Sequence, residues 1–193
     1  MSTDGVNKTR RNLIAGTALL GAVGAVGVAV PFVKSWNPSA KAKAAGAPVT
    51  ADISKLEPGQ QMVVEWRGKP VWVVRRTKEA LADLAKVESD LRDPKSDESV
   101  QPENAKNQWR SIKPEYLVLT GICTHLGCSP LYRPEVAPAD LGPSWRGGFF
   151  CPCHGSRYDL AGRVYSGVPA PLNLEVPPYK FDSDTVITIG EGA

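Results

Sequence analysis

The distribution of apolar and polar residues divides the chain into an apolar N-terminal segment and a longer part in which short apolar runs predict β-strands. Residues 13–33 (LIAGTALLGAVGAVGVAVPFV) carry no charged side chain, and about 20 such residues suffice to cross the hydrocarbon layer of a membrane as a helix. Glycine and alanine recur in this segment, and small residues let a neighbouring helix approach closely in lipid. We therefore expect residues 13–33 to form a transmembrane helix beside a partner helix.

A cleaved signal peptide and a buried core helix are the alternatives for this segment. Signal peptides have a shorter apolar core of about 7–15 residues, although AKAKAAGA at residues 40–47 could supply the small-residue cleavage site. A core helix is disfavoured because the rest of the chain is not apolar enough to surround it. TRRNLI at residues 9–14 resembles a twin-arginine export signal of bacteria. Because Lys and Arg are balanced on the two flanks, this signal must decide the orientation in place of the positive-inside rule.

The remainder of the chain predicts a tether followed by a mostly β head. Residues 34–48 are rich in Ala, Lys, Gly and Pro without an apolar period, which predicts a flexible tether. From residue 49 to residue 193 the pattern is mostly that of strands, and residues 60–76 predict a hairpin around the turn RGKP. Further strands are predicted at residues 115–120, 145–150 and 185–190.

An insertion at about residues 78–113 interrupts the strands. Leu81, Leu84 and Leu91 share one face of a predicted helix over residues 78–92, which Pro94 would end. Residues 93–108 are polar and predict a loop. The pattern alone gives the insertion no role beyond a guessed contact with a partner subunit.

Composition narrows the classes of function. A length of 193 residues allows one medium-sized domain with an appendage. The net charge of +3 is spread along the chain, without a basic stripe of interleaved aromatics. Nucleic-acid binding therefore has little support.

All four cysteines and both histidines fall within two short boxes. Box one is CTHLGC (residues 123–128) and box two is CPCHGS (residues 151–156). Each box lies at the end of a predicted strand, where a rigid scaffold can position ligands. Two thiolates and two imidazoles can bind structural zinc, but zinc leaves two cysteines unexplained. A [2Fe–2S] cluster in which one iron takes two Cys and the other takes two His matches the pattern better.

The two boxes resemble the signature boxes of the Rieske iron-sulfur protein family of cytochrome bc complexes. The similarity also covers the export-type N-terminus, the anchor, the tether and GVPAPLNL at residues 167–174. The resemblance implies a mostly β fold, with a Rieske-type antiparallel β-sandwich head, a small cluster-binding subdomain at about residues 115–175 and one N-terminal transmembrane helix. Residues 1–12 would then be a cytoplasmic N-terminus. Family loops usually read Gly-Pro-Ala-Pro, whereas Val168 separates Gly167 from Pro169 here, so the loop is expected to be one residue longer.

The resemblance also implies roles for the residues of the boxes. Cys123 and Cys151 would bind the inner iron of the [2Fe–2S] cluster, and His125 and His154 the outer iron. Cys128 and Cys153 would form a disulfide, with two buried free thiols as the alternative. A disulfide needs an oxidising compartment while the cluster is assembled in the cytoplasm, so folded export would explain the twin arginines.

Three further residues have roles implied by the resemblance. Ser156 and Tyr158 would donate hydrogen bonds to cluster sulfurs and raise the reduction potential, although turn chemistry or core packing is the more usual role of such residues. Leu126 would contact the quinol pocket of cytochrome b. His154 would hydrogen-bond ubiquinol and accept its proton, with His125 as its companion.

The function implied is electron transfer from ubiquinol to a membrane-bound c-type cytochrome within a quinol:cytochrome c oxidoreductase. The head would be in the periplasm, on a single-pass anchor in the bacterial inner membrane, and would move on the tether between cytochrome b and the c-type cytochrome. The alternatives are the Rieske small subunit of another exported oxidoreductase such as arsenite oxidase, a Rieske ferredoxin or oxygenase component, and a zinc-stabilised binding module. The anchor and the second cysteine pair disfavour the ferredoxin, and the full Tyr158 and proline-loop pattern disfavours the arsenite oxidase subunit.

Overall fold

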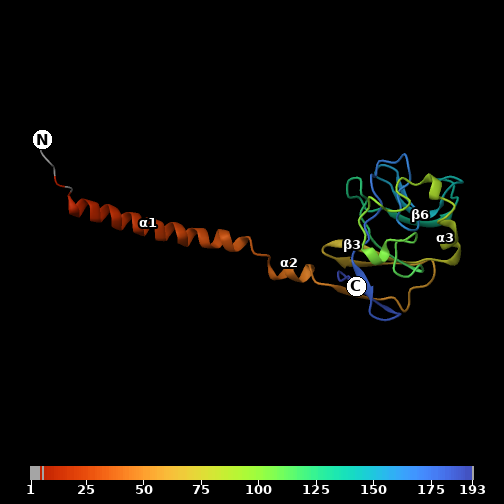
Figure 1. The fold of residues 1–193 in the computed structure, drawn as a ribbon, viewed down its shortest axis with the longest axis horizontal. Helices are drawn as coiled ribbons and strands as arrows, with labels where there is room; N and C mark the ends of the chain where they lie inside the picture. Colours follow the sequence, from red (N-terminus) through yellow and green to blue (C-terminus); the bar gives the residue numbers. More distant parts are fainter. Residues whose placement is uncertain (1–4, 6, 193) are drawn as a thin grey trace. The chain divides into compact units, whose positions relative to one another are not determined.

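The computed structural model describes residue 5 and residues 7–192, and the chain divides into two compact units. The N-terminal unit is Met1–Ala44, and the second, which we call the head, is Ala45–Ala193. Figure 1 follows the chain through both units from red to blue.

The N-terminal unit consists mainly of one long helix, α1 (Lys8–Ser35), which is long and apolar enough to cross a membrane. Its 28 residues correspond to a length of about 42 Å at about 1.5 Å per residue. The Asn7 side chain caps the helix by accepting a hydrogen bond from the Arg10 backbone N–H at 3.1 Å. The helix includes the predicted span 13–33 and begins before it, so Arg10 and Arg11 lie in the helix. Of the predicted N-terminus 1–12, residues 1–4 and 6 lie outside the described residues.

Within the predicted tether, residues Ala40–Ala45 form a short helix, α2. Its sequence AKAKAA contains only Ala and Lys, which are among the best helix formers. This helix has no apolar face, so the pattern of apolar residues does not predict it. A helix of six residues is marginal when isolated, so the flexibility of the tether stays a prediction.

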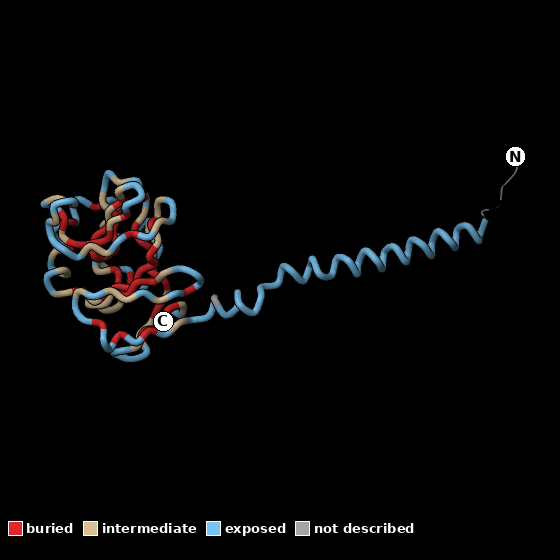
Figure 2. The backbone as a smooth tube through the Cα atoms, turned by 180° about the vertical axis from the view of Figure 1, so that it is seen from behind, coloured by how far each residue is buried: buried red, intermediate tan, exposed pale blue. Residues whose placement is uncertain are grey.

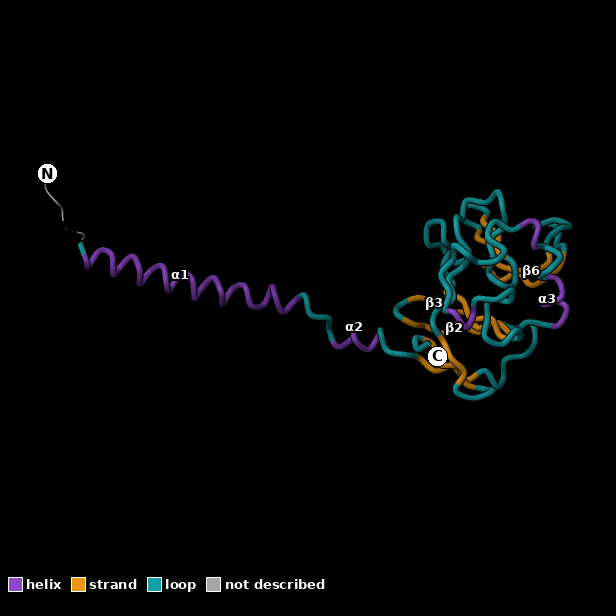
Figure 3. The backbone as a smooth tube through the Cα atoms, viewed as in Figure 1, coloured by secondary structure: helices purple, strands orange, loops and turns teal. Residues whose placement is uncertain are grey.

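The head contains three antiparallel sheets of three strands each (Figure 3). The first sheet consists of β1 (Val49–Asp52), β9 (Val186–Ile189) and β8 (Tyr179–Phe181), in that order. The second consists of β2 (Gln61–Trp66), β3 (Lys69–Arg75) and β4 (Tyr116–Thr120). The third consists of β5 (Leu131–Val136), β6 (Arg146–Cys151) and β7 (Ser156–Tyr158). The expected mostly β, antiparallel head is therefore confirmed.

The predicted hairpin of residues 60–76 is formed by β2 and β3, with Trp66 paired to Lys69. Its two-residue turn consists of Arg67 and Gly68, whose φ angles are 53° and 70°. Two positive φ values in succession are typical of the turn whose twist matches that of the flanking strands.

The predicted helix over residues 78–92 is wrong in its extent, because α3 spans only Lys78–Asp83. Two 3-10 turns follow it, η1 (Glu88–Asp90) and η2 (Glu103–Ala105). Contacts with the rest of the head replace the expected helical bonds: the Arg163 guanidinium donates to the Leu84 carbonyl at 2.8 Å, and Leu91 pairs with Tyr165 in a β-bridge. Tertiary contacts thus override the apolar period of this segment.

The hydrophobic core joins the second sheet to the third. Trp72 of β3 stacks on Phe149 of β6 with ring centroids 5.0 Å apart, and one large cluster of buried side chains includes both. Figure 2 shows the buried residues in the interior of the head. This packing fixes β4 and β6 relative to each other, and each of these strands leads into one of the boxes.

Candidate metal centre

Both boxes fold back on their first cysteine in the same way. The Gly127 N–H donates to the Cys123 carbonyl, and the Gly155 N–H donates to the Cys151 carbonyl, both at 3.0 Å. The two glycines have φ angles of 84° and 75°, which residues with a side chain rarely adopt. The shared spacing Cys-x-x-x-Gly is visible in the sequence and could have predicted this similarity.

Box two is a tight loop in a β-hairpin. Cys151 at the end of β6 pairs with Ser156 at the start of β7, so residues 152–155 form the loop between them. Box one follows β4 and is closed by a hydrogen bond from the Cys123 N–H to the Cys128 carbonyl at 2.7 Å. Rigid sheets therefore present both loops, as the strand pattern predicted.

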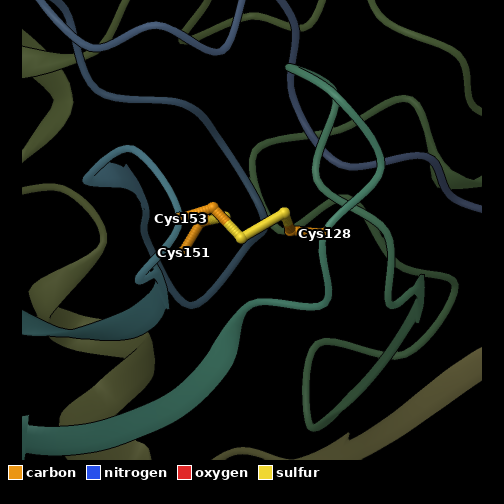
Figure 4. Close-up of side chains that lie close together, drawn as sticks. All are labelled: Cys128, Cys151 and Cys153. Carbon is orange, nitrogen blue, oxygen red and sulfur yellow. A yellow bond between two sulfur atoms is a disulfide. The ribbon is translucent and has the colours of Figure 1, made fainter.

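A disulfide between Cys128 and Cys153 joins the two loops (Figure 4), as the resemblance implied. The sulfurs of Cys128, Cys151 and Cys153 lie within 4.8 Å of one another. Since two of them are bonded to each other, only Cys151 in this group has a thiol free to bind a metal.

Cys123 and Cys151 are the free cysteines of the described residues, and both are buried. Burial raises the pKa of the Cys151 thiol, and its hydrogen bond with Cys123 and the charge of that neighbour raise it further, while the Cys153 and His154 backbone N–H groups oppose the shift. Two thiolates side by side in an apolar interior are unfavourable without a cation. The pair is therefore suited to bind a metal.

His125 of box one and His154 of box two lie next to each other, and both are less buried than Cys123 and Cys151. Their rings are 4.7 Å apart between centroids and nearly perpendicular, at 85°. His125 is half-buried and His154 is exposed. Two buried thiols and two outer imidazoles fit a [2Fe–2S] cluster of mixed ligation. Tetrahedral zinc accepts the same four donors, so the family of the chain decides between them.

Tyr158 brings a buried hydroxyl to the Cys123 sulfur, at an oxygen–sulfur distance of 3.1 Å. The same oxygen accepts the Thr124 N–H at 3.2 Å. Burial and the hydrogen bond with Cys123 raise the pKa of Tyr158, opposed in part by its hydrogen bonds with Thr124, so the hydroxyl keeps its proton at neutral pH. Because the Thr124 hydroxyl donates to the Leu172 carbonyl at 2.7 Å, the Tyr158 hydrogen is left for the Cys123 sulfur or the Thr124 oxygen. The sequence pattern did not identify Thr124, because its partners are far along the chain.

Ser156 is fully buried at the start of β7. Its oxygen accepts the Ala170 N–H at 3.1 Å, which leaves its own hydrogen available as a donor. Ala170 and Leu172 belong to residues 167–174, which we call the proline loop. The loop thus contacts Ser156 directly and reaches Tyr158 through Thr124.

Leu126 is the exposed apolar residue of box one. Its side chain is 72% exposed although it lies in a loop that is otherwise held by a disulfide and backbone hydrogen bonds. An apolar side chain fixed at the surface is suited to contact a partner.

Known families match almost the whole chain. Residues 1–39 match the family described as "Ubiquitinol-cytochrome C reductase Fe-S subunit TAT signal", and residues 47–179 match "Rieske [2Fe-2S] domain". The chain is 62% identical over 192 residues to the ubiquinol-cytochrome c reductase iron-sulfur subunit of Allochromatium vinosum, covering 99% of this chain and 93% of that one. It is 45% identical to the subunit of the same name from Bradyrhizobium diazoefficiens, covering 94% of each.

A solved structure described as "Hyperthermophilic respiratory Complex III" matches with a TM-score of 0.47 and 30% identity, covering 89% of this chain and 97% of that one. The family matches confirm the resemblance of the two boxes, and with it the [2Fe–2S] cofactor over zinc. The chain belongs to the Rieske [2Fe–2S] family, among the iron-sulfur subunits of ubiquinol-cytochrome c reductase.

Proposed function

We propose that the chain transfers electrons from ubiquinol to a c-type cytochrome, as one subunit of a quinol:cytochrome c oxidoreductase. The observation that carries this proposal is the pairing of an exposed and a half-buried imidazole, His154 and His125, next to two buried thiols. The names of the relatives, which pair ubiquinol with cytochrome c, support the choice of the two reaction partners.

Four side chains would hold the cofactor. Cys123 and Cys151 would bind the inner iron through their sulfurs, and His125 and His154 would bind the outer iron through one ring nitrogen each. When bound, a cluster of this ligation takes up and releases one electron at a higher potential than an all-cysteine cluster. The buried hydroxyls of Ser156 and Tyr158 would donate hydrogen bonds to sulfur and so favour the reduced state.

His154 would receive the proton of ubiquinol. Its exposed ring can approach a quinol hydroxyl, and the ring nitrogen that does not bind iron would accept the hydrogen bond and then hold the proton. His125 is more buried, and the two rings pack edge to face. Leu126 would dock against the apolar wall of the quinol pocket in cytochrome b and exclude water from the contact.

The head would then carry its electron to the c-type cytochrome by moving on the tether. The apolar helix α1 would anchor the chain in the bacterial inner membrane. The disulfide and the match of residues 1–39 to a TAT signal support a periplasmic head. The partners are therefore cytochrome b and a membrane-bound c-type cytochrome.

Electron paramagnetic resonance of the full chain tests this function. Ascorbate should produce the rhombic signal of a reduced two-iron cluster with mixed His and Cys ligation, and ubiquinol should produce the same signal in the assembled complex before cytochrome c is reduced. A signal that only dithionite produces would place the chain in a low-potential pathway and refute the ubiquinol step. Zinc in place of iron would refute the electron-transfer function.

A further inference from the structure

Part of the insertion lies alongside the proline loop and its flanking residues. The Ser166 N–H donates to the Asp90 carbonyl at 2.8 Å, and the Arg92 N–H donates to the Val164 carbonyl at 2.9 Å. Further along, the Val176 N–H donates to the Val100 carbonyl at 3.1 Å. Backbone hydrogen bonds thus connect residues 90–100 to the residues that flank both ends of the proline loop. We call residues 90–100 the clamp segment.

A buried polar network connects the clamp segment to Asn173, in the proline loop. The Asn173 amide nitrogen donates to the Asp93 carbonyl at 2.9 Å and to the Ser96 hydroxyl at 2.8 Å. The Asn173 amide oxygen accepts the Val164 N–H at 2.7 Å. Asn173 is 2% exposed and Asp93 is 7% exposed, so water does not compete strongly for these hydrogen bonds and leaving one unmade is costly.

Ser99 links both partners of this network through one hydroxyl. Its Oγ donates to the Asp93 carboxylate at 2.7 Å and accepts the Asn173 backbone N–H at 3.2 Å. The Asp93 carboxylate also accepts the backbone N–H groups of Asp97 and Glu98, at 2.8 and 3.2 Å. The clamp segment therefore surrounds the Asp93 carboxylate, and the Ser99 hydroxyl lies next to the proline loop.

The proline loop in turn contacts the hydroxyls next to the candidate ligands. The Ala170 N–H donates to Ser156 Oγ at 3.1 Å. The Leu172 carbonyl accepts the Thr124 hydroxyl, which lies 3.2 Å from the Tyr158 oxygen. A shift of residues 170–172 would therefore change the orientation of both hydroxyls.

We propose that Asp93, Ser99 and Asn173 are positioning residues, which act through the proline loop to fix the hydroxyls of Ser156 and Tyr158 toward the sulfurs of the cluster. The proposal rests on the proposed function and gives the insertion a role within it. Hydroxyls fixed toward sulfur favour the reduced state, because reduction adds negative charge to the cluster. A clamp segment that no longer holds the loop lowers the reduction potential without removing any ligand.

The test compares three variants of the full chain with its cluster bound. Ser99→Ala removes the hydroxyl that joins Asp93 to Asn173. Ser99→Thr keeps a hydroxyl at that position. Ser89→Ala is the matched control, because Ser89 is an exposed serine of the same insertion whose hydroxyl is 3.4 Å from its neighbour Asp90. Two quantities are measured: the midpoint potential by redox titration of the resonance signal, and amide hydrogen exchange of residues 164–176.

Ser99→Ala is expected to make reduction of the cluster about threefold less favourable, a shift of about 28 mV from the one-electron relation of 59 mV per tenfold. Exchange of the Ala170 and Asn173 amides should become faster in the same variant. Ser99→Thr and Ser89→Ala should match the wild type in both quantities. If Ser99→Ala does not retain its cluster, Arg92→Met gives the second test, since this exposed side chain donates to the Ala170 and Pro171 carbonyls at 3.4 Å.

An unchanged potential in a variant with faster loop exchange would overturn the proposal, because the loop would then move without affecting the hydroxyls. Unchanged exchange and potential in Ser99→Ala, or in Arg92→Met where that variant takes its place, would overturn it as well. The wild-type measurement tests the proposed function separately, since a wild type that ubiquinol does not reduce refutes that function whatever the variants do.

Discussion

Replacing Tyr158 by Phe removes one hydroxyl and leaves the ring in the core. The hydroxyl lies 3.1 Å from the Cys123 sulfur, and Tyr158 is fully buried, so water cannot replace the lost hydrogen bond. Hydrogen bonds to charged groups contribute about 1.5–3 kcal/mol. With the cluster bound, the Tyr158 hydroxyl is expected to donate to the Cys123 sulfur in both oxidation states and more strongly in the reduced state, so only part of this energy affects the potential.

A difference of about 1 kcal/mol between the two states makes reduction of the cluster about fivefold less favourable, or lowers the midpoint potential by about 40 mV. Redox titration of the resonance signal measures this shift directly. Tyr165→Phe is the matched control, because the Tyr165 hydroxyl is also buried but has no hydrogen-bond partner among the described residues. An unchanged or raised potential in Tyr158→Phe, or an equal drop in both variants, would refute the role of the hydroxyl.

Four further predictions concern stability and turnover. Replacing both Cys128 and Cys153 by Ser should lower the free energy of unfolding by about 3.5 kcal/mol, from the loop-closure entropy of a separation of 25 residues, and an unchanged urea midpoint would contradict this. Asp159→Asn breaks the buried ion pair with Arg163, at 2.7 Å, and should cost about 3–5 kcal/mol. Asp184→Asn, in the exposed pair with Lys113, should leave the urea midpoint unchanged. An equal loss of stability in Asp159→Asn and Asp184→Asn would show that burial does not make the first ion pair more important for stability. Leu126→Ala should raise the KM for ubiquinol without changing the resonance signal. Leu131→Ala, at a residue 51% exposed on β5, should leave the KM unchanged. Equal KM values in the two variants would show that Leu126 does not contact the quinol pocket. Prolines at Ala40, Ala42 and Ala44 should slow quinol-driven cytochrome c reduction without altering the signal, and unchanged turnover would contradict movement of the head on the tether.

Strands β2, β3, β4, β6 and β9 and the two boxes could be predicted from the sequence because their signals are local. Strands β1, β5, β7 and β8 were not predicted individually. The hairpin of β2 and β3 follows from two apolar runs around a turn, and the boxes follow from the grouping of rare residue types. The apolar helix α1 likewise needs only composition.

The end of α3 and the contacts of the insertion with the proline loop could not be predicted, because both involve residues that are distant along the chain. Arg163 bonds the Leu84 carbonyl across 79 residues, and Asn173 bonds Asp93 across 80. Thr124 was missed for the same reason, since it reaches Leu172 across 48 residues. Apolar periodicity carries no information about such pairs, and the polar run at residues 93–108 gave no sign that Asp93 and Ser96 are buried.

The rigidity of the two boxes affects the speed of electron transfer. Gly127 and Gly155 donate matching hydrogen bonds to the carbonyls of the two free cysteines, and the disulfide joins the boxes. An electron moves fastest when the nuclei around it hardly shift, because reorganisation of the surroundings is part of the activation barrier. Loops closed at both ends by backbone bonds and tied to each other by a covalent bond leave the polypeptide little freedom to relax. Fixed dipoles of this kind need not reorient when the charge changes. The barrier within the head is therefore expected to be small, so that encounter with the partner subunits limits the rate.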